Sequence, residues 1–232
     1  MAFGQDDLVY LEENGLVVIE PERIAELPEG WVRGPGSGIT APNLDDANDA
    51  TGAGFITWQG NQFLGDPGNG LIMIPLQIAN PGTYRFEWRN QVGNGTSTTD
   101  HNDTWVKIEA ESFYGQRTAN VVCPKGLDPA ANDCIGGSPN GSGSDGWFKV
   151  YSSGANTWRF STSTSDNDAH AIYARFDRAD VYFLLLSARS SFHVIDRIVL
   201  HSDAFAGNPR DLGLPPSAVV QTGVVFIDGF EN

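Results

Sequence analysis

The feature that most constrains this fold is an alternation of apolar and polar residues with a period of two. In residues 83–89, Tyr84, Phe86 and Trp88 share one face of an extended segment, and charged side chains occupy the other. Similar alternation or a short apolar run marks residues 16–20, 54–58, 71–78, 104–108, 147–151, 158–162, 171–176, 181–188 and 193–200. Turn signals such as Asn80-Pro81-Gly82 separate these segments. The pattern predicts an all-β protein, a two-sheet antiparallel β-sandwich.

Composition divides the chain into one domain and two flanking parts. Residues 1–14 are acidic and form a predicted leader, residues 15–202 contain the predicted strands, and residues 203–232 form a predicted C-terminal extension. The only helical candidate is a turn or two around residues 21–27. We find no internal repeat and expect a monomer.

The balance of charge excludes two classes of partner. The chain has 14 Lys and Arg against 29 Asp and Glu, which gives a formal net charge of -15. Such a chain repels phosphate backbones and anionic lipids, so we expect no binding to nucleic acid or to a membrane surface. No apolar run approaches the roughly 20 residues of a membrane-spanning helix.

Cys123 and Cys134 are the only two cysteines, and the segment between them is rich in Pro, Gly, Asn and Asp. Two thiols without a neighbouring histidine do not make a zinc site. A local disulfide would stabilise the fold by ~3 kcal/mol in the chain-entropy model and implies an oxidising compartment. The alternative is two separate thiols.

The N-terminus lacks the basic start and apolar segment of a signal peptide. Either the protein stays inside the cell or a leader is absent from this sequence. Residues 226–232 resemble a short phrase found at the C-terminus of exported proteobacterial proteins. We therefore expect a secreted bacterial protein.

Carboxylates occur on apolar strand faces at two places. A period of two puts Asp196 on the same face as its apolar neighbours, and Glu20 and Glu22 alternate in the same way near the first strand. An ionised carboxylate in such a position needs a cation or several donors. If the first and last strands pair, the three acids can converge on Ca²⁺. The alternative is that Asp196 pairs with an arginine such as Arg23 or Arg197.

Three short motifs resemble carbohydrate-binding module families six and thirty-five over about residues 16–200. They are Ile-Glu-x-Glu at 19–22, Pro-Gly-Thr-Tyr-Arg-Phe at 81–86 and x-Ile-Asp-x-Ile-x-Leu at 194–200. The resemblance implies a calcium-containing jelly roll of the galactose-binding-like kind, appended to a catalytic domain in secreted glycan-degrading enzymes. It also implies that Glu20, Glu22 and Asp196, together with backbone carbonyls, are ligands of a structural calcium.

The chain departs from this family pattern at two positions and in its loops. Pro21 replaces the small residue usual between the two glutamates, and Val194 replaces an asparagine that often binds sugar hydroxyls. The loops at 90–103 and 115–146 are long, polar and rich in Gly, Asn and Ser. Loops of this length in a compact domain are usually functional or mobile.

Candidate sugar-binding residues lie next to these loops. Pyranose rings stack on aromatic side chains while polar groups bind their hydroxyls, a pairing that is general for small-ligand sites. Trp31 and Trp147 adjoin Gly-rich stretches and are the predicted stacking platforms; the alternative is that they are core residues. The predicted polar residues are His101, Asn102, Asp103 and His193. The alternatives for these are turn caps or, for the first cluster, a second metal site.

These features predict non-catalytic polysaccharide binding by a secreted, calcium-stabilised module. One alternative is a jelly-roll polysaccharide lyase, for which His101, His193, Arg89 and Tyr114 would be the candidate residues. A hydrolase with paired carboxylates and an adhesive module that binds protein are the others.

Overall fold

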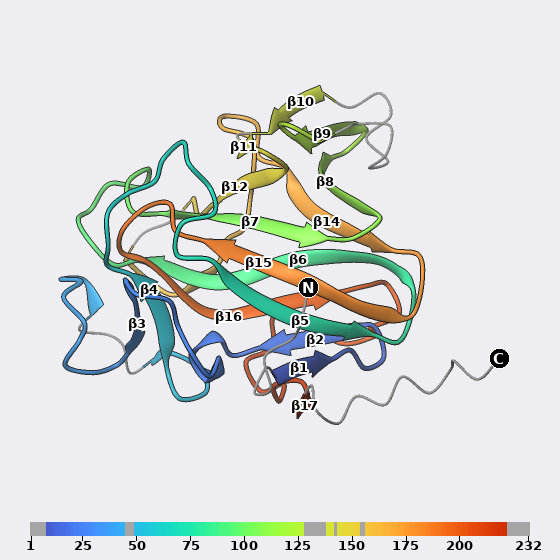
Figure 1. The fold of residues 1–232 in the computed structure, drawn as a ribbon, viewed down its shortest axis with the longest axis horizontal. Helices are drawn as coiled ribbons and strands as arrows, with labels where there is room; N and C mark the ends of the chain where they lie inside the picture. The colour runs from blue at the N-terminus through green and yellow to red at the C-terminus, as the bar shows by residue number, and fades with distance from the viewer. Residues whose placement is uncertain (1–7, 45–48, 128–137, 142, 154–155, 222–232) are drawn as a thin grey trace.

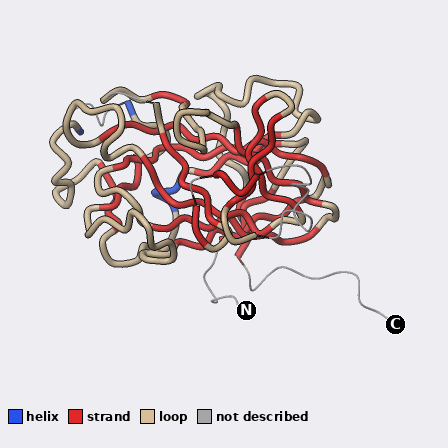
Figure 2. Tube along the Cα trace, turned by 90° about the horizontal axis from the view of Figure 1, so that it is seen from above, coloured by secondary structure: helices blue, strands red, loops and turns tan. Residues whose placement is uncertain are grey.

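The computed structural model describes residues 8–44, 49–127, 138–141, 143–153 and 156–221. These residues contain no α-helix, and a 3-10 helix of three residues, η1 (Pro21–Arg23), lies in the place of the expected helical turn. The strands are β1 (Leu8–Leu11), β2 (Leu16–Ile19), β3 (Trp31–Gly34), β4 (Phe55–Trp58), β5 (Ile72–Ile78), β6 (Gly82–Val92), β7 (Asp103–Glu109), β8 (Ser112–Arg117), β9 (Asn120–Pro124), β10 (Ser138–Gly141), β11 (Gly143–Ser144), β12 (Trp147–Tyr151), β13 (Arg159–Phe160), β14 (Ala171–Phe176), β15 (Asp180–Ser187), β16 (His193–His201) and β17 (Val219–Gln221). Figures 1 and 2 show strands throughout the body of the molecule.

Two sheets form the predicted sandwich (Figure 1). The seven-stranded sheet has the order β11-β12-β7-β15-β5-β1-β17, and the ten-stranded sheet contains β10-β9-β8-β14-β6-β16-β4-β3 with β13 beside β6 and β2 beside β16. Most neighbours are antiparallel; β1 with β5 and β10 with β9 are the parallel pairs among the described strands. The prediction of a two-sheet antiparallel sandwich is confirmed.

The core lies between the sheets and follows the period-two pattern. Tyr84, Phe86 and Trp88 of β6 point into it and are at most 1% exposed. They meet residues of the facing sheet such as Leu184 and Leu186 of β15. Burying each large apolar side chain contributes roughly 1.5–3 kcal/mol, so this alternation is what holds the two sheets together.

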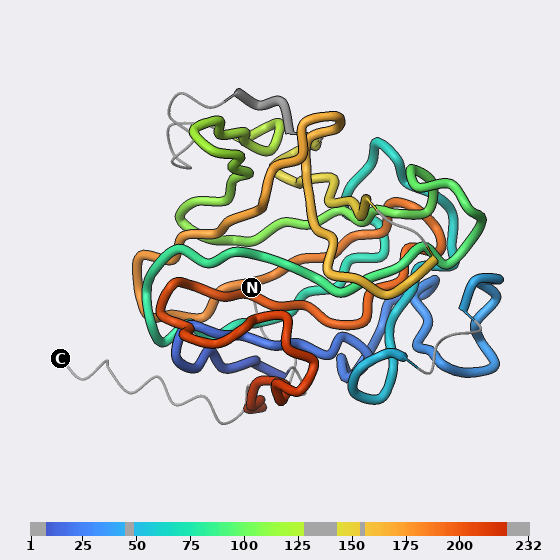
Figure 3. The backbone as a smooth tube through the Cα atoms, turned by 180° about the vertical axis from the view of Figure 1, so that it is seen from behind, coloured from blue at the N-terminus to red at the C-terminus, as the bar shows by residue number. Residues whose placement is uncertain are grey.

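The folded domain extends beyond the predicted limits of 15 and 202 at both ends. β1 lies within the predicted leader and pairs with β5, and β17 lies within the predicted extension and pairs with β1. Ser217 N also donates to Val18 O at 2.9 Å. Figure 3 shows the segment after β16 returning beside the first strands. These strands are only four and three residues long, too short for a clear alternation.

The long loop predicted at 115–146 holds more strand than expected. β8 continues to Arg117, β9 pairs with it as a hairpin, and β10 and β11 follow. Cys123 lies in β9 and is fully buried. Cys134 lies outside the described residues, so the predicted disulfide stays a prediction.

A β-bulge in β16 changes the face on which Asp196 lies. The register with β6 shifts between Ile195 and Arg197, which makes Asp196 the extra residue. Ile198 and Leu200 therefore point into the core, whereas Val194 packs in a separate apolar cluster on the outer side. The prediction that Asp196 shares a face with all three was wrong, because strict alternation cannot continue through a bulge.

Candidate functional site

Glu20, Glu22 and Asp196 come together as predicted, at the end of β2, in η1 and in the β16 bulge. We call them, with their partners Thr51, Arg89 and Arg197, the carboxylate cluster. Thr51 joins two of the acids, since its hydroxyl lies 3.0 Å from both Glu20 Oε2 and Asp196 Oδ1. Its backbone N–H also donates to Asp196 Oδ1 at 2.7 Å. The segment before β4 thus closes over the bulge.

Two buried arginines neutralise two of the three acids. Arg89 of β6 pairs with Asp196, and Arg197 of β16 donates from Nε to Glu20 Oε1 at 2.8 Å. Arginine pairing was the open alternative to a cation, although the partner of Asp196 is Arg89 rather than Arg23 or Arg197. Burial nevertheless raises the pKa values of both Glu20 and Asp196, against the lowering effect of their arginines.

Glu22 is the acid that lacks a cationic partner. Its Oε1 accepts from Ala53 N at 3.0 Å, and its buried Oε2 has no hydrogen-bond partner among the described residues. Burial, together with the charges of Glu20 and Asp196, raises the pKa of Glu22 to about 7. Gly52, at φ +59°, allows this close approach, since a Cβ there would lie 2.7 Å from Glu22 Oε1. The cluster therefore holds one uncompensated buried carboxyl.

The cluster fits a hard cation in the chemistry of its donors. Three carboxylates and a hydroxyl are the oxygen ligands that Ca²⁺ prefers, and the orphaned Glu22 oxygen is a group that a cation would satisfy. The spacing of these donors does not match that of a bound ion, since no group of three or more His, Cys, Asp or Glu in the described chain lies close enough to hold a metal ion. Arg89 and Arg197 already engage two of the three carboxylates.

The two predicted stacking platforms are buried. Trp31 is 6% exposed, donates from Nε1 to Gly70 O at 2.7 Å and packs edge-on against Trp58. Trp147 is 8% exposed and belongs to an apolar cluster with Trp105 and Leu185. Neither ring offers the open face that stacking requires, so their alternative interpretation as packing residues describes them better.

His193 belongs to the core rather than to a surface site. Its side chain is fully buried, with Nδ1 2.8 Å from Thr104 Oγ1 and the ring packed edge-on against Trp88. Burial lowers the pKa of His193 to about 3. This burial corrects the prediction that His193 joins a polar site with His101. His193 precedes the bulge of β16 and lies on the same inner face as Ile195, with its ring beside Trp88.

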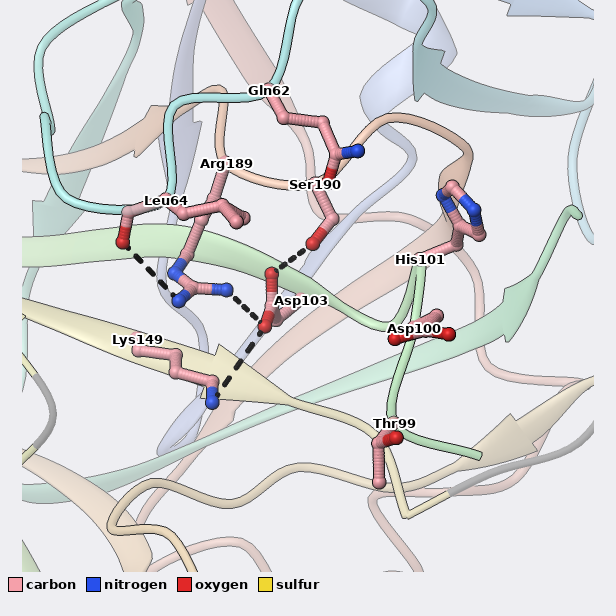
Figure 4. Close-up of a pocket in the computed structure, with 9 residues that line it drawn as sticks. All are labelled: Gln62, Leu64, Thr99, Asp100, His101, Asp103, Lys149, Arg189 and Ser190. Carbon is pink, nitrogen blue, oxygen red and sulfur yellow. Dashed lines mark hydrogen bonds and ion pairs between the residues drawn. The ribbon is translucent and has the colours of Figure 1, made fainter. Parts of the chain in front are cut away.

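The other three predicted polar residues meet at one edge of the seven-stranded sheet. β7 begins there, β12 and β15 end there, and the segment before β5 arrives there, because these neighbours are antiparallel. A pocket of about 390 Å³ opens at this edge, and we call it the first pocket (Figure 4). It is lined by Gln62, Leu64, Thr99, Asp100, His101, Asp103, Lys149, Arg189 and Ser190.

Asp103 organises the first pocket. Arg189 and Ser190 both donate to its carboxylate, and Lys149 Nζ lies 3.9 Å from Oδ2 (Figure 4). The Arg189 guanidinium also stacks over the ring of Trp105 at 4.9 Å. His101 stands apart, with Nδ1 2.7 Å from Ser191 O. The carboxylate is therefore held within the protein, while the exposed side chains around it remain open to a ligand.

A second pocket of about 500 Å³ adjoins the first and shares Thr99 and Lys149 with it. Its other lining residues are Thr98, Asn102, Tyr151, Ser152, Ser153, Asp166 and Asn167. Asn102 Nδ2 donates to Ser152 O at 2.8 Å, which fixes the two residues side by side. Asn102 Oδ1 and Ser152 Oγ are buried and have no hydrogen-bond partner in the described structure.

Sequence reasoning missed several residues of this pocket pair. Lys149 and Tyr151 alternate with the buried Phe148 and Val150 of β12, so the period of two already placed them on the outer face. Arg189 and Ser190 lie in a polar stretch after β15, but only the fold brings that stretch to Asp103.

The four candidate lyase residues are not assembled into one site. His101 lines the first pocket, His193 is in the core, and Arg89 pairs with Asp196. Tyr114 projects from the ten-stranded sheet and stacks on Tyr173, with ring centroids 5.6 Å apart.

The described chain also contains no helix long and apolar enough to cross a membrane.

Together the fold and the site define a two-sheet β-sandwich with paired polar pockets where strands of the seven-stranded sheet begin and end. Neither a family model nor a curated protein matches the sequence. Among solved structures, a GH26-CBM35 β-(1,4)-mannanase from Podospora anserina is similar in fold at 14% identity and a TM-score of 0.45. The match covers 85% of this chain and only 29% of the mannanase chain. At this level of likeness no activity or ligand carries over.

Proposed function

We propose that this protein binds a polysaccharide, without cleaving it, in the paired pockets. The observation that carries the proposal is that two polar pockets share a wall formed by Thr99 and Lys149. Their volumes of about 390 and 500 Å³ leave room for a ligand of more than one sugar unit. Chains of repeating sugars present such units in succession, which a single enclosed cavity could not accept.

The chemistry of the second pocket supports a sugar. Tyr151 supplies a half-buried aromatic ring, and Asn102 and Ser152 supply two polar atoms without protein partners. An apolar ring face beside a few placed polar groups is the usual composition of a small-ligand site. Buried polar groups that lack partners are uncommon in folded proteins and call for one.

A glycan array tests the proposal. We expect binding to at least one polysaccharide class, and we expect Tyr151→Ala to weaken it at least about tenfold, because stacking and the pocket wall are lost. Tyr173→Ala is the matched control, since Tyr173 is a half-buried strand tyrosine that lines neither pocket. An array without any bound glycan, or equal losses in the two variants, would refute the proposal.

We further propose that Glu20, Glu22 and Asp196 hold a structural Ca²⁺. The support is the buried Glu22 carboxyl with its orphaned oxygen beside two further acids. When bound, the ion would supply the positive charge that Arg89 and Arg197 do not give to Glu22. Metal analysis and thermal melting with and without a chelator test this. We expect bound calcium and a lower Tm in the chelator; no bound calcium and an unchanged Tm would contradict it.

A further inference from the structure

The charges that line the two pockets are compensated from within the protein. Arg189 pairs with Asp103, donates to Leu64 O at 3.2 Å and stacks over Trp105. Lys149 Nζ lies 2.7 Å from Asp166 Oδ1 and 3.9 Å from Asp103 Oδ2. Each cation of the pockets is therefore already engaged with a carboxylate.

The lining as a whole carries an excess of negative charge. Asp100 is exposed and forms no ion pair within the described part of the chain, and it adds to the two acids that the cations already serve. The whole chain has a formal net charge of -15. A carboxylate or sulfate on a ligand would meet like charge both at a distance and at the site.

Neutral polar atoms are the groups that the second pocket leaves without a hydrogen-bond partner. Asn102 Oδ1 is an acceptor, and Ser152 Oγ can donate and accept, so together they match a pair of sugar hydroxyls. Both atoms are buried, so a sugar hydroxyl reaches them only when the two side chains turn toward the pocket, and it would then replace no hydrogen bond to bulk water. A buried polar group without a hydrogen bond costs more free energy than an exposed one, because water can satisfy the exposed group.

Resting on the proposed function, we propose that the ligand is an uncharged glycan rather than a uronate-containing or sulfated one, and that Asn102 and Ser152 bind two of its hydroxyl groups. Recognition then depends on neutral hydrogen bonds and on the Tyr151 ring, and little on attraction between opposite charges.

The test compares neutral and uronate-containing oligosaccharides of equal length by isothermal titration. We expect the neutral series to bind more tightly, with a Kd that changes less than about twofold between roughly 50 and 500 mM NaCl. Tighter binding of the uronate series, weakened steeply by salt, would overturn the inference and leave the proposed function standing. If neither series nor any array glycan binds, the proposed function itself fails.

A pair of variants tests the assigned hydroxyl contact. We expect Ser152→Ala to raise the Kd for the neutral glycan about fivefold, in line with the loss of one buried hydrogen bond. Thr164→Val is the control, because Thr164 Oγ1 is equally buried and without a partner but lines neither pocket. Equal affinity of the two variants, both folded by circular dichroism, would overturn the assignment.

Discussion

The carboxylate cluster and the paired pockets are both built around a buried acid held by an arginine, yet they leave different groups unsatisfied. In the cluster, Arg89 pairs with Asp196, and the group left over is the carboxyl oxygen of Glu22. In the pockets, Arg189 pairs with Asp103, and the groups left over include a neutral amide oxygen and a hydroxyl. A leftover buried charge favours a cation, whereas leftover neutral groups beside a cavity favour a hydroxylated ligand. The two sites are therefore distinguished by their unsatisfied atoms more than by their residue types.

The largest expected effect comes from breaking the arginine pair of the cluster. Asp196→Asn leaves the Arg89 guanidinium buried without its counter-charge, which typically costs about 3–5 kcal/mol. We expect the Tm to fall by on the order of 10 °C, because one kcal/mol shifts a domain of this size by about 2–4 °C. Glycan affinity of the folded fraction should not change. Thermal melting and titration of the same sample measure both.

The exposed Asp166 provides the control for that loss, since Asp166→Asn changes an aspartate of the same size. A fall in Tm as large as that of Asp196→Asn would mean that burial and pairing do not explain the cluster. A loss of glycan affinity in folded Asp196→Asn would mean that the two sites are not separate.

A smaller effect, with opposite signs in two conditions, is expected at Glu22. Its folded pKa of about 7 lies above its ordinary value, so the metal-free protein is stabilised by a proton there and loses that stability as pH rises from about 4.5 through 7. In chelator at pH 8 we expect Glu22→Gln to stabilise the fold by about 1 kcal/mol, and in calcium to destabilise it. Denaturant titration at both conditions checks this. If Glu22→Gln changed the free energy of unfolding in the same direction in chelator and in calcium, Glu22 would not belong to a cation site.

The smallest effect is expected at the rim of the pockets. Asp166→Asn removes one exposed partner of Lys149, an interaction worth under about 1 kcal/mol in stability. The freed ammonium should improve binding of uronate oligosaccharides about twofold to fivefold and leave neutral ones unchanged. Titration with both series measures the change. Weaker binding of the neutral series would mean that Asp166 itself contacts the ligand, and the two oligosaccharide series would then no longer differ only through the charge of Lys149.

The sequence predicted the strands well because burial acts on every second residue, as Tyr84, Phe86 and Trp88 illustrate. The same local logic failed at Asp196, where a bulge adds one residue, and at Trp31, whose Gly-rich neighbourhood hides a buried ring. Short strands such as β1 carry too few residues for a period to be seen.

The candidate site was predictable only in part. His101, Asn102 and Asp103 are adjacent in sequence and were found together. Their partners Arg189 and Ser152 lie 86 and 50 residues away, and only sheet pairing brings them there. Alternation gives the face on which a side chain lies, but not the strand it will meet.

A crystal structure grown with calcium and the oligosaccharide selected by the array tests whether an uncharged glycan lies in the paired pockets and a cation in the carboxylate cluster. We expect sugar hydroxyls within hydrogen-bond distance of Asn102 Oδ1 and Ser152 Oγ, and a calcium ion bound by Glu22. Sugar on another face of the sandwich, or Glu22 with no ion beside it, would contradict these assignments.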